Sequence, residues 1–256
     1  MINKGDDRIM LPAVELYKAL NKAQQQKLFD ELQLAYDKLP KSTCKNCARC
    51  CSIGSPPAFF IEYINMYRYV RDHLKDRWQD FLSKSAEYFY LELVDVNQKC
   101  PFLGDDKRCD IYEVRPATCR FFGLLSKQEF EKGNLNQGLQ YVAKKLWEDH
   151  QIKIPDEIAN SKIEYCGDVS NSTGKPVPKK ELGIIIGELA KLDAYFFPEQ
   201  LVDQEGTMLP YPVHLMNTVL GDGARARKLK IMKEYADHQS RELLDPIVAR
   251  AAKYEF

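Results

Sequence analysis

Apolar residues recur at helical spacing in several stretches of the chain, which is the pattern of helices that bury one face. The first stretch covers residues 12–38 and ends before Pro40, with its apolar face at Tyr17, Leu20, Leu28, Leu32 and Tyr36. The second stretch covers residues 59–91, with its apolar face at Ile64, Tyr67, Leu74, Trp78 and Phe81. We therefore expect two long helices in the first third of the chain.

The middle of the chain predicts another helix with a clear beginning. Ser126 and Glu129 have the spacing of a capping box, in which each residue satisfies a backbone N–H of the first helical turn. The helix is expected to continue to about His150. Gly133 and Gly138 weaken it, because glycine has a low helix propensity.

The remaining segments predict a linker and more helices. Residues 171–178 combine polar residues with Gly174 and two prolines, which is typical of a linker. A helix is expected over residues 180–197 and a helical hairpin over residues 224–254. Residues 91–96 are compatible with a short strand.

These elements predict a mainly α fold, in which a helical domain surrounds a loop-rich cysteine core with little or no β-sheet. Residues 1–170 are expected to form the cysteine-cluster domain with its flanking helices. Residues 171–256 are expected to form a helical extension that packs on it. A chain of 256 residues can bury a sizeable core without covalent cross-links.

Charge and hydropathy exclude several classes of partner. The chain has 37 basic and 37 acidic residues, so nothing favours a nucleic-acid partner. The N-terminus lacks the apolar segment of a secretory signal, and the longest apolar stretch, near residues 182–186, is too short to span a membrane. We therefore predict a cytoplasmic protein, a location in which thiols stay reduced and cysteine clusters bind metal or do chemistry.

Eight cysteines are the strongest chemical signal of the chain. Four fall within eight residues, and cysteines this close in the chain cannot all form disulfides with one another without strain. Thiolates at this density can instead surround a metal ion or a cluster. All eight are predicted metal ligands: Cys44, Cys47, Cys50, Cys51, Cys100, Cys109, Cys119 and Cys166. For Cys166, which stands alone, the alternative is a small buried core residue.

The spacing of the cysteines leaves two kinds of metal centre open. Cys44, Cys47 and Cys50 at two-residue intervals, followed by a remote Cys100-Pro101, are similar to a bacterial ferredoxin, in which a loop and a distant cysteine hold a [4Fe-4S] cluster. Eight thiols also suffice for two four-thiolate zinc sites. Successive side chains point in different directions, so Cys50 and Cys51 are not expected to chelate one ion together. The four histidines lie away from both groups, which favours the cluster over zinc.

Three blocks of sequence together resemble the YkgJ-type cysteine-cluster (CxxCxxCC) family, a zinc- or iron-chelating domain. The blocks are Cys44-x2-Cys47-x2-Cys50-Cys51, Cys100-Pro101-Phe102-Leu103 and Cys109-x-Ile111-Tyr112-x2-Arg115-Pro116-x2-Cys119-Arg120-x-Phe122. The chain departs from the family pattern at Arg108, where a glycine is frequent, and at Gly123, where a proline is frequent. The resemblance implies metal binding and leaves the metal open. A flagellin lysine N-methylase carries the same signature, so methyl transfer to a protein substrate is a function implied by analogy.

Two arginines flank the last cysteine of this signature. Arg115 and Arg120 are candidate cofactor-binding residues, because a guanidinium near a thiolate-bound cluster offsets its negative charge. The alternative for Arg115 is an ion pair with Asp110 or Glu113 that holds the loop.

The sequence thus leaves three functions open. The favoured one is a metal-cluster protein, with [4Fe-4S] preferred over zinc and with a redox or cofactor-chemistry role. The second is a lysine methyltransferase that uses S-adenosylmethionine, although the chain has neither a glycine-rich nucleotide fingerprint nor the C-x3-C-x2-C spacing of radical methyl-donor enzymes. The third is a zinc-stapled interaction module.

Overall fold

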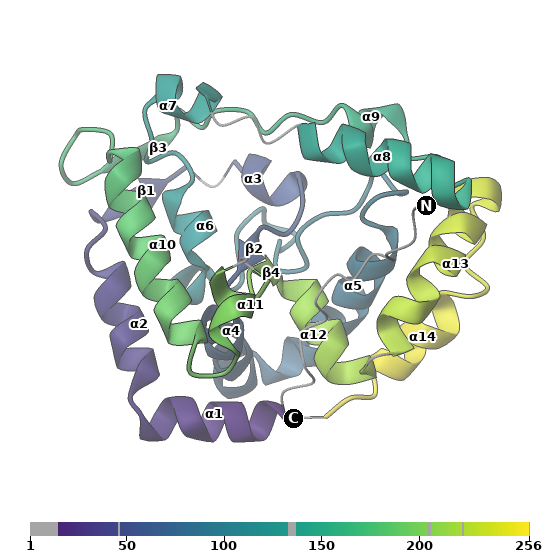
Figure 1. The fold of residues 1–256 in the computed structure, drawn as a ribbon, viewed down its shortest axis with the longest axis horizontal. Helices are drawn as coiled ribbons and strands as arrows, with labels where there is room; N and C mark the ends of the chain where they lie inside the picture. The colour runs from purple at the N-terminus through teal and green to yellow at the C-terminus, as the bar shows by residue number, and fades with distance from the viewer. Residues whose placement is uncertain (1–14, 46, 133–136, 204–205, 222, 256) are drawn as a thin grey trace.

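The fold is mainly α-helical, as predicted, in a computed structural model that describes residues 15–45, 47–132, 137–203, 206–221 and 223–255 (Figure 1). The elements of the first half are α1 Leu16–Gln25, α2 Leu28–Tyr36, β1 Ser42–Cys44, α3 Arg49–Ser52, β2 Pro57–Ala58, α4 Phe60–His73, η1 Lys75–Arg77, α5 Trp78–Leu91, η2 Tyr112–Val114 and α6 Ala117–Phe121. Those of the second half are α7 Lys127–Lys132, α8 Gln137–His150, α9 Asp156–Ala159, β3 Val169–Asn171, α10 Lys179–Asp193, α11 Glu199–Asp203, β4 Leu209–Pro210, α12 Tyr211–Leu220, α13 Gly223–His238 and α14 Asp245–Ala251.

The first predicted helix, over residues 12–38, is two helices. Its beginning lies outside the described residues, and the described part is broken between α1 and α2 at Lys27. Lys27 has a φ of 56°, a left-handed conformation that ends a right-handed helix. Apolar residues continue on both sides of the break, so their spacing alone could not reveal it.

The second predicted helix, over residues 59–91, is also divided. Leu74 has a φ of −131° and ends α4, and a short 3₁₀ turn then leads into α5. The expectation of a strand over residues 91–96 is wrong. These residues form turns at the end of α5, in which the N–H groups of Val94 and Asp95 both donate to the carbonyl of Leu91.

The later predictions hold in most respects. The Ser126 side chain accepts a hydrogen bond from the N–H of Glu129 at 3.2 Å, which confirms the cap at the start of α7. The helix predicted to reach His150 is assigned as α7 and α8; Gly133 lies outside the described residues, and Gly138 lies in α8. The helix after the linker is α10, and the predicted C-terminal hairpin is α13 and α14.

Helices α4, α5 and α12 form the centre of the molecule. Helices α1, α2 and α10 pack together on one side, and α13 and α14 pack against α5 on the other (Figure 1). Tyr63, Phe81 and Leu215 are completely buried where the central helices meet. One cluster of buried residues includes side chains from both sides of residue 170. The division into domains at that position stays a prediction.

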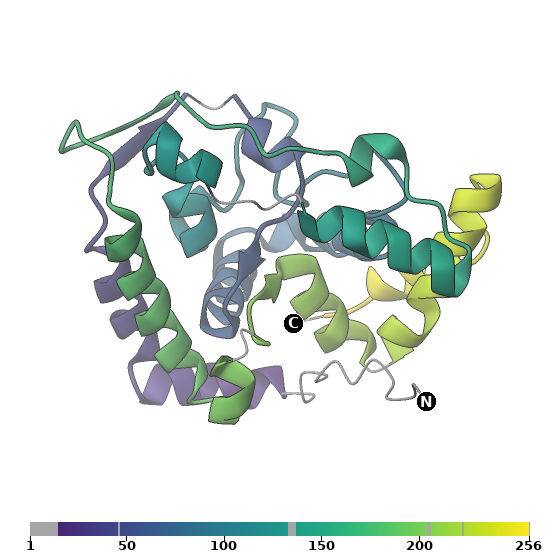
Figure 2. The same ribbon diagram turned by 45° about the horizontal axis from the view of Figure 1, so that its top comes forward.

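Two short antiparallel pairs of strands connect distant parts of the chain. In the pair β1–β3, Cys44 is opposite Val169; in the pair β2–β4, Pro57 is opposite Pro210. Figure 2 shows β1 and β3 on the rim of the helical body, next to the loop that carries α3. These pairs position the cysteine-bearing loops against the helices.

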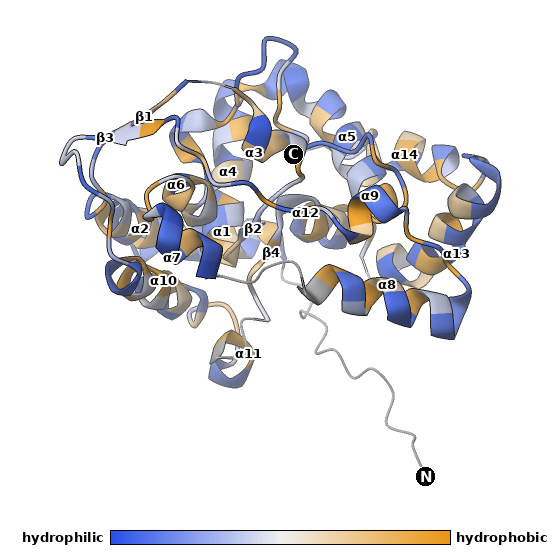
Figure 3. Ribbon diagram, turned by 90° about the horizontal axis from the view of Figure 1, so that it is seen from above, coloured by the Kyte–Doolittle hydropathy of each residue, from blue (hydrophilic) through white to orange (hydrophobic). Residues whose placement is uncertain are grey.

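The outer helices α7, α8 and α13 carry many hydrophilic residues, as Figure 3 shows from above. None of the helices in the described part of the chain is both long and apolar enough to cross a membrane.

Candidate metal centre

The first cysteine motif forms a single helical turn between two unusual backbone positions. Ala48, before α3, has a φ of 60°, and Gly54, after it, has a φ of 141°. Cys50 and Cys51 lie on this turn, and their sulfur atoms are 3.7 Å apart. Two thiolates on one metal ion are separated by about 3.8 Å when the metal–sulfur bonds are about 2.3 Å long. The sulfur atoms of these successive residues therefore lie close together, whereas the sequence predicts side chains that point in different directions.

The second motif is a tight loop that folds back toward α3. The N–H of Cys100 donates to the carbonyl of Cys51 at 2.9 Å, which fixes the loop directly against the first motif. Leu103 and Cys109 form an isolated antiparallel bridge, and the N–H of Gly104 donates to the carbonyl of Arg108 at 2.8 Å. Cys100 and Cys109 thus lie on facing arms of one loop.

Cys119 is positioned by α6, which begins directly after Pro116. Two buried contacts hold the first turn of this helix in place. The N–H of Ala117 donates to Glu62 Oε1 at 2.6 Å, and the hydroxyl of Thr118 donates to the carbonyl of Pro57 at 2.7 Å. Cys119 therefore sits on a turn that is tied to α4 and β2.

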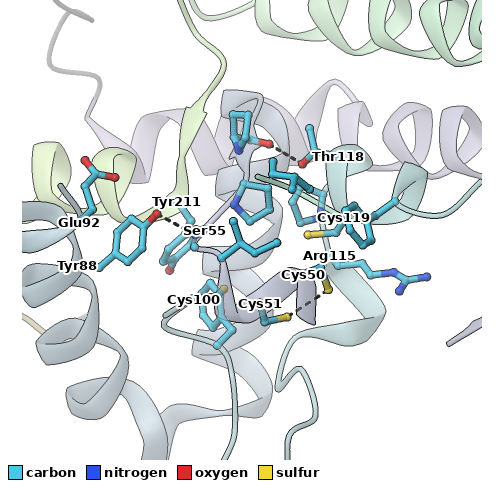
Figure 4. A pocket seen from close by; sticks show the side chains of 18 of the residues that line it. Cys50, Cys51, Ser55, Tyr88, Glu92, Cys100, Arg115, Thr118, Cys119 and Tyr211 are labelled. Atoms are coloured by element: carbon cyan, nitrogen blue, oxygen red, sulfur yellow. Dashed lines mark hydrogen bonds between the residues drawn. The ribbon is translucent and has the colours of Figure 1, made fainter. Parts of the chain in front are cut away.

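Five cysteines from these three segments line one cavity of about 330 Å³: Cys50, Cys51, Cys100, Cys109 and Cys119. Figure 4 shows the sulfur atoms of Cys50 and Cys51 pointing toward one another. Beyond the sulfurs the cavity continues between apolar side chains, which include Ile53, Leu93, Phe122, Leu139, Ile158 and Ile163. Thiols thus form one part of a cavity that is otherwise largely apolar.

The pKa values of these thiols differ, because some are raised by burial and one is lowered by a hydrogen bond. Burial raises the pKa of Cys100 to about 12 and that of Cys109 to about 11, and it raises the pKa of Cys119 well above the ordinary value. The hydrogen bond with Cys51 lowers the pKa of Cys50 to about 6. A buried thiolate needs a cation beside it, and a bound metal ion supplies that charge and deprotonates its ligands.

Arg115 lies next to these thiols, whereas Arg120 faces away from them. Arg115 lines the cavity, stacks on the ring of Tyr112 at 3.9 Å, and its charge acts to lower the pKa of Cys50 and Cys109. The guanidinium of Arg120 donates to the carbonyl of Arg115 at 2.9 Å and lies 4.0 Å from the ring of Tyr36. Arg120 therefore holds the loop from its inner side.

The three other cysteines gather in a different place. Cys47 and Cys166 line a separate cavity of about 230 Å³, and Cys44 is on strand β1 beside it. Burial raises the pKa of Cys166, and the negative charges of the Cys47 and Cys44 thiolates raise it further. Hydrogen bonds from Arg49 lower the pKa of Cys47. The eight predicted ligands are thus divided into a group of five and a group of three.

The chain departs from the family pattern at Arg108 and Gly123, and the structure explains the departure at Gly123. Gly123 has a φ of 83°, which a proline, with φ fixed near −65°, cannot adopt. A Cβ atom at Gly123 would lie 2.7 Å from Val169 Cγ2 and 3.2 Å from the carbonyl oxygen of Cys166. The chain here packs against the segment that carries Cys166. Arg108 contributes its carbonyl to the loop between Cys100 and Cys109.

The residues fit a metal by donor chemistry and by space. The ligands available in the larger cavity are thiols, which are typical of zinc and iron–sulfur sites. Within the described ranges, no three or more Cys, His, Asp or Glu side chains already surround a single point at the distances of one metal ion.

Some residues that shape the site were not predicted from the sequence. Glu62, a buried acid in α4, holds the start of α6, and Arg49 contacts Cys47 Sγ at 3.4 Å through Nε. Arg49 lies inside the cysteine motif, a signal that could have identified it. His214 is no ligand of these groups: its ring stacks on Tyr63 and its Nε2 is 3.0 Å from the carbonyl oxygen of Ala58.

Comparison with known proteins gives one match, which covers the segment that carries the cysteine motifs. Comparisons with curated proteins and with solved structures gave no match. Residues 43–136 match the CxxCxxCC family model, described as "Putative zinc- or iron-chelating domain". The match covers seven of the eight cysteines and leaves Cys166 outside. Residues 43–136 of this chain are therefore similar to the CxxCxxCC family, whose description names zinc or iron as the chelated metal.

Proposed function

We propose that the five-cysteine cavity holds an iron–sulfur cluster of the [4Fe-4S] type and that the chain uses it in redox or cofactor chemistry. The observation that carries this proposal is the convergence of five thiols, from three separate segments, on one cavity of about 330 Å³. A cluster needs four thiolates around a core several ångströms wide. The cavity offers both the thiolates and the space.

The number of thiols favours a cluster over a single ion, because five cysteines line the cavity and a tetrahedral ion binds four. Within the described part of the chain, no three potential ligands surround one point closely enough for one metal ion. Thiolates on a cluster bind different iron atoms, so their sulfurs lie farther apart than those on one ion. Arg115, beside Cys50 and Cys109, suits the net negative charge of such a centre.

The apolar part of the cavity favours cofactor chemistry over simple electron transfer. Leu139, Ile158 and Ile163 contribute to the apolar lining, and the polar residues of the lining include Glu92 and Tyr88. Ligand sites are typically apolar clefts with a few polar groups that orient the ligand. A substrate with an apolar portion, such as a protein side chain, can thus approach the centre.

The protein groups around such a centre have separable roles. The thiolates of the cavity would hold the cluster, which supplies electrons or an iron site for chemistry when bound. The Ser55 N–H donates to Tyr88 Oη at 2.9 Å, so this hydroxyl is oriented at the cavity wall. Lys228 forms an ion pair with Glu92 at 2.6 Å, and Glu92 lines the cavity.

A zinc site is the second candidate, and one observation favours it. The 3.7 Å separation of the Cys50 and Cys51 sulfurs is that of two thiolates on one ion. Two further thiolates from the same cavity would complete a four-thiolate zinc site after their side chains rotate. The role of the chain would then be structural, as a stapled interaction module.

Methyl transfer to a protein lysine is supported less directly. Among the described residues, β-structure is limited to two two-stranded antiparallel pairs and one isolated bridge, so the parallel sheet of a conventional nucleotide-type site is missing there. A methyl donor would therefore have to bind in another kind of site, for which the five-cysteine cavity is the candidate. The apolar lining of the cavity suits the aliphatic portion of a lysine side chain.

Anaerobic purification of the full chain tests the proposal. The protein is expected to be brown and to contain acid-labile sulfide in about the same amount as iron. The variant Cys119→Ser should lose both iron and sulfide. Its matched control, Ser52→Ala, changes a residue next to Cys51 that is no ligand and should keep both. Colourless protein that contains zinc and no sulfide, even after anaerobic reconstitution, would exclude the cluster.

A further inference from the structure

Tyr211, at the start of α12, has a buried hydroxyl that lacks a hydrogen-bond partner. The residue is 2% exposed, and none of the described residues forms a hydrogen bond with its Oη. A buried polar group without a partner loses the hydrogen bonds that water gives it in the unfolded chain, so such groups are rare in folded proteins. The hydroxyl of Tyr211 therefore needs a partner that these residues do not supply.

Neighbouring side chains and the backbone hold the ring of Tyr211 in place. The ring centroid lies 4.6 Å from that of Phe102, in an edge-to-face arrangement, and 5.3 Å from that of Tyr63. Strand β4, directly before Tyr211, pairs with β2, and Pro210 is opposite Pro57. Because both the ring and the backbone are held, the hydroxyl oxygen has a fixed position in the unliganded protein.

The same side chain lines the five-cysteine cavity. Figure 4 shows Tyr211, Tyr88 and Cys100 among the side chains that surround it. Phe102 follows Cys100 by two residues, so the ring that packs against Tyr211 belongs to a loop that carries a thiol of the cavity. A molecule bound in this cavity is therefore the candidate partner of the Tyr211 hydroxyl.

The charged side chains of the cavity lining have other partners. Among the described residues of the lining, the acidic and basic side chains are Glu92 and Arg115. Glu92 forms an ion pair with Lys228 at 2.6 Å. Arg115 lies beside the thiols and stacks on the ring of Tyr112 at 3.9 Å. An ionised ligand group next to Tyr211 would thus lack a counter-charge of its own, and burial of an unpaired charge is costly.

We propose that the cavity binds a small uncharged organic molecule with a carbonyl oxygen, and that the hydroxyl of Tyr211 donates a hydrogen bond to this oxygen. A carbonyl accepts a hydrogen bond and adds no donor that would need a partner in turn. Apolar residues of the lining, such as Leu93, Ile158 and Ile163, would cover the hydrocarbon part of the molecule. Tyr211 thereby selects the polar group of the ligand. This inference deepens the proposed function and rests on it only in taking this cavity as the site of the chemistry.

Isothermal titration calorimetry of the full chain, purified anaerobically, tests the site with four probes that share a phenyl group. Acetophenone carries the carbonyl, α-methylstyrene has a CH₂ group in place of the oxygen, and benzoate and benzylamine carry opposite charges. Acetophenone should bind more tightly than the other three. In Tyr211→Phe its dissociation constant should rise about tenfold, because the carbonyl would be buried without a donor. The affinity for α-methylstyrene should be equal in the parent protein and the variant.

A stability measurement separates this role from a purely structural one. Phenylalanine keeps the ring and removes only the unpaired hydroxyl, so the urea midpoint of Tyr211→Phe without probe should be no lower than that of the parent protein. Ser85→Ala is the matched control. Ser85 is buried in α5, its hydroxyl also lacks a partner among the described residues, and it is not part of the cavity lining. This variant should also keep its midpoint, and it should bind acetophenone like the parent protein.

Several results would overturn the proposal. Acetophenone that binds no more tightly than α-methylstyrene, or that binds Tyr211→Phe as tightly as the parent protein, would exclude the hydrogen bond. Tighter binding of benzoate or benzylamine would assign the cavity to a charged ligand. A lower urea midpoint in Tyr211→Phe would show that the hydroxyl has a partner within the protein. Loss of iron in this variant, with unchanged probe binding, would show that the hydroxyl serves the metal centre.

Iron and acid-labile sulfide, measured in the same samples, distinguish this inference from the proposed function. If the protein contains no sulfide but binds acetophenone in a manner that depends on Tyr211, the cluster is wrong and the ligand site stands. If iron and sulfide are present and acetophenone is not preferred over α-methylstyrene, the cluster stands and the ligand site is wrong.

Discussion

At the scale of single residues, Glu62 connects three segments around the cysteine cavity. It is 1% exposed, and its two carboxylate oxygens accept three hydrogen bonds. The donors are the hydroxyl of Tyr36 at 2.5 Å, the N–H of Phe59 at 2.9 Å and the N–H of Ala117 at 2.6 Å. Glu62 therefore links α2, the start of α4 and the helix that carries Cys119.

The variant Glu62→Gln tests this connection. The glutamine NH₂ group would face a donor where the carboxylate accepts, so at least one buried hydrogen bond is lost. The expected loss of unfolding free energy is about 1–3 kcal/mol, measured by urea denaturation. We also expect less bound metal per chain, because the turn that positions Cys119 is held less firmly.

Glu87→Gln is the matched control for this change. Glu87 pairs with Arg241 at 2.5 Å, but both side chains are about one third exposed. Ion pairs at such positions contribute about 0–1 kcal/mol. A loss in Glu62→Gln no larger than that in Glu87→Gln would show that the buried contacts of Glu62 do not hold the site.

The identity of the candidate ligands could be predicted from the sequence, but their grouping could not. The dense spacing of Cys44, Cys47, Cys50 and Cys51 indicates a metal site without any structure. Cys44 and Cys47 lie near Cys166 because β1 pairs with β3, and these two strands are far apart in the chain. Such non-local pairing leaves no local pattern in either segment.

At the scale of elements, helix positions were predictable and helix breaks were not. The apolar spacing correctly indicates α4 and α5, because it reports which face is buried. The break between them depends on the backbone of Leu74, an apolar residue that also suits a continuous helix. A break of this kind is set by how the two helices pack and not by local sequence.

The start of α4 is capped by a residue from a distant helix. The two carboxylate oxygens of Asp193, at the end of α10, accept hydrogen bonds from the N–H groups of Phe60, at 2.9 Å, and Ile61, at 2.8 Å. The positive end of the helix dipole lies at the same point. Burial raises the pKa of Asp193 to about 7, although these hydrogen bonds oppose the shift.

This shift predicts that stability decreases with pH. In the unfolded chain Asp193 ionises near its ordinary pKa of about 3.9, whereas in the folded chain it keeps its proton up to pH near 7. The stabilisation is complete below the unfolded pKa and is lost as the pH rises through the folded pKa. Between these values the unfolding free energy attributable to Asp193 should fall by up to about 1.4 kcal/mol per pH unit.

Comparison with Asp193→Asn isolates this contribution. Burial lowers the pKa of His214 to about 4, which makes stability rise between pH 4 and its ordinary value, but this effect is present in both proteins. The difference in unfolding free energy between parent and variant should therefore shrink from pH 5 to pH 7 and stay constant above pH 8. A difference that grows with pH would contradict the raised pKa.

At the scale of the whole molecule, the cysteine loops lie against a helical body that has its own core. Helices α4, α5 and α12 bury Tyr63, Phe81 and Leu215 against one another. Cys100 and Cys109 are only partly buried and pack at the edge of this core. The loops that carry the thiols have little regular secondary structure, whereas the central helices are held together by apolar packing.

Metal removal should therefore loosen part of the molecule and leave the rest folded. Small zinc domains unfold completely without metal, because site formation supplies most of their folding free energy. Here we expect chelation to abolish hydrogen-exchange protection and protease resistance mainly within residues 40–125, in the loops around α3, Cys100–Cys109 and α6. Amides of α5 and α12 should stay protected and the far-UV circular dichroism should largely persist, because local opening leaves independently packed elements intact.

Cys119→Ser should reproduce the chelated pattern, and re-addition of metal should restore protection in the parent protein only. Uniform loss of protection across α5 and α12 would show instead that the metal centre and the helical core fold as one cooperative unit.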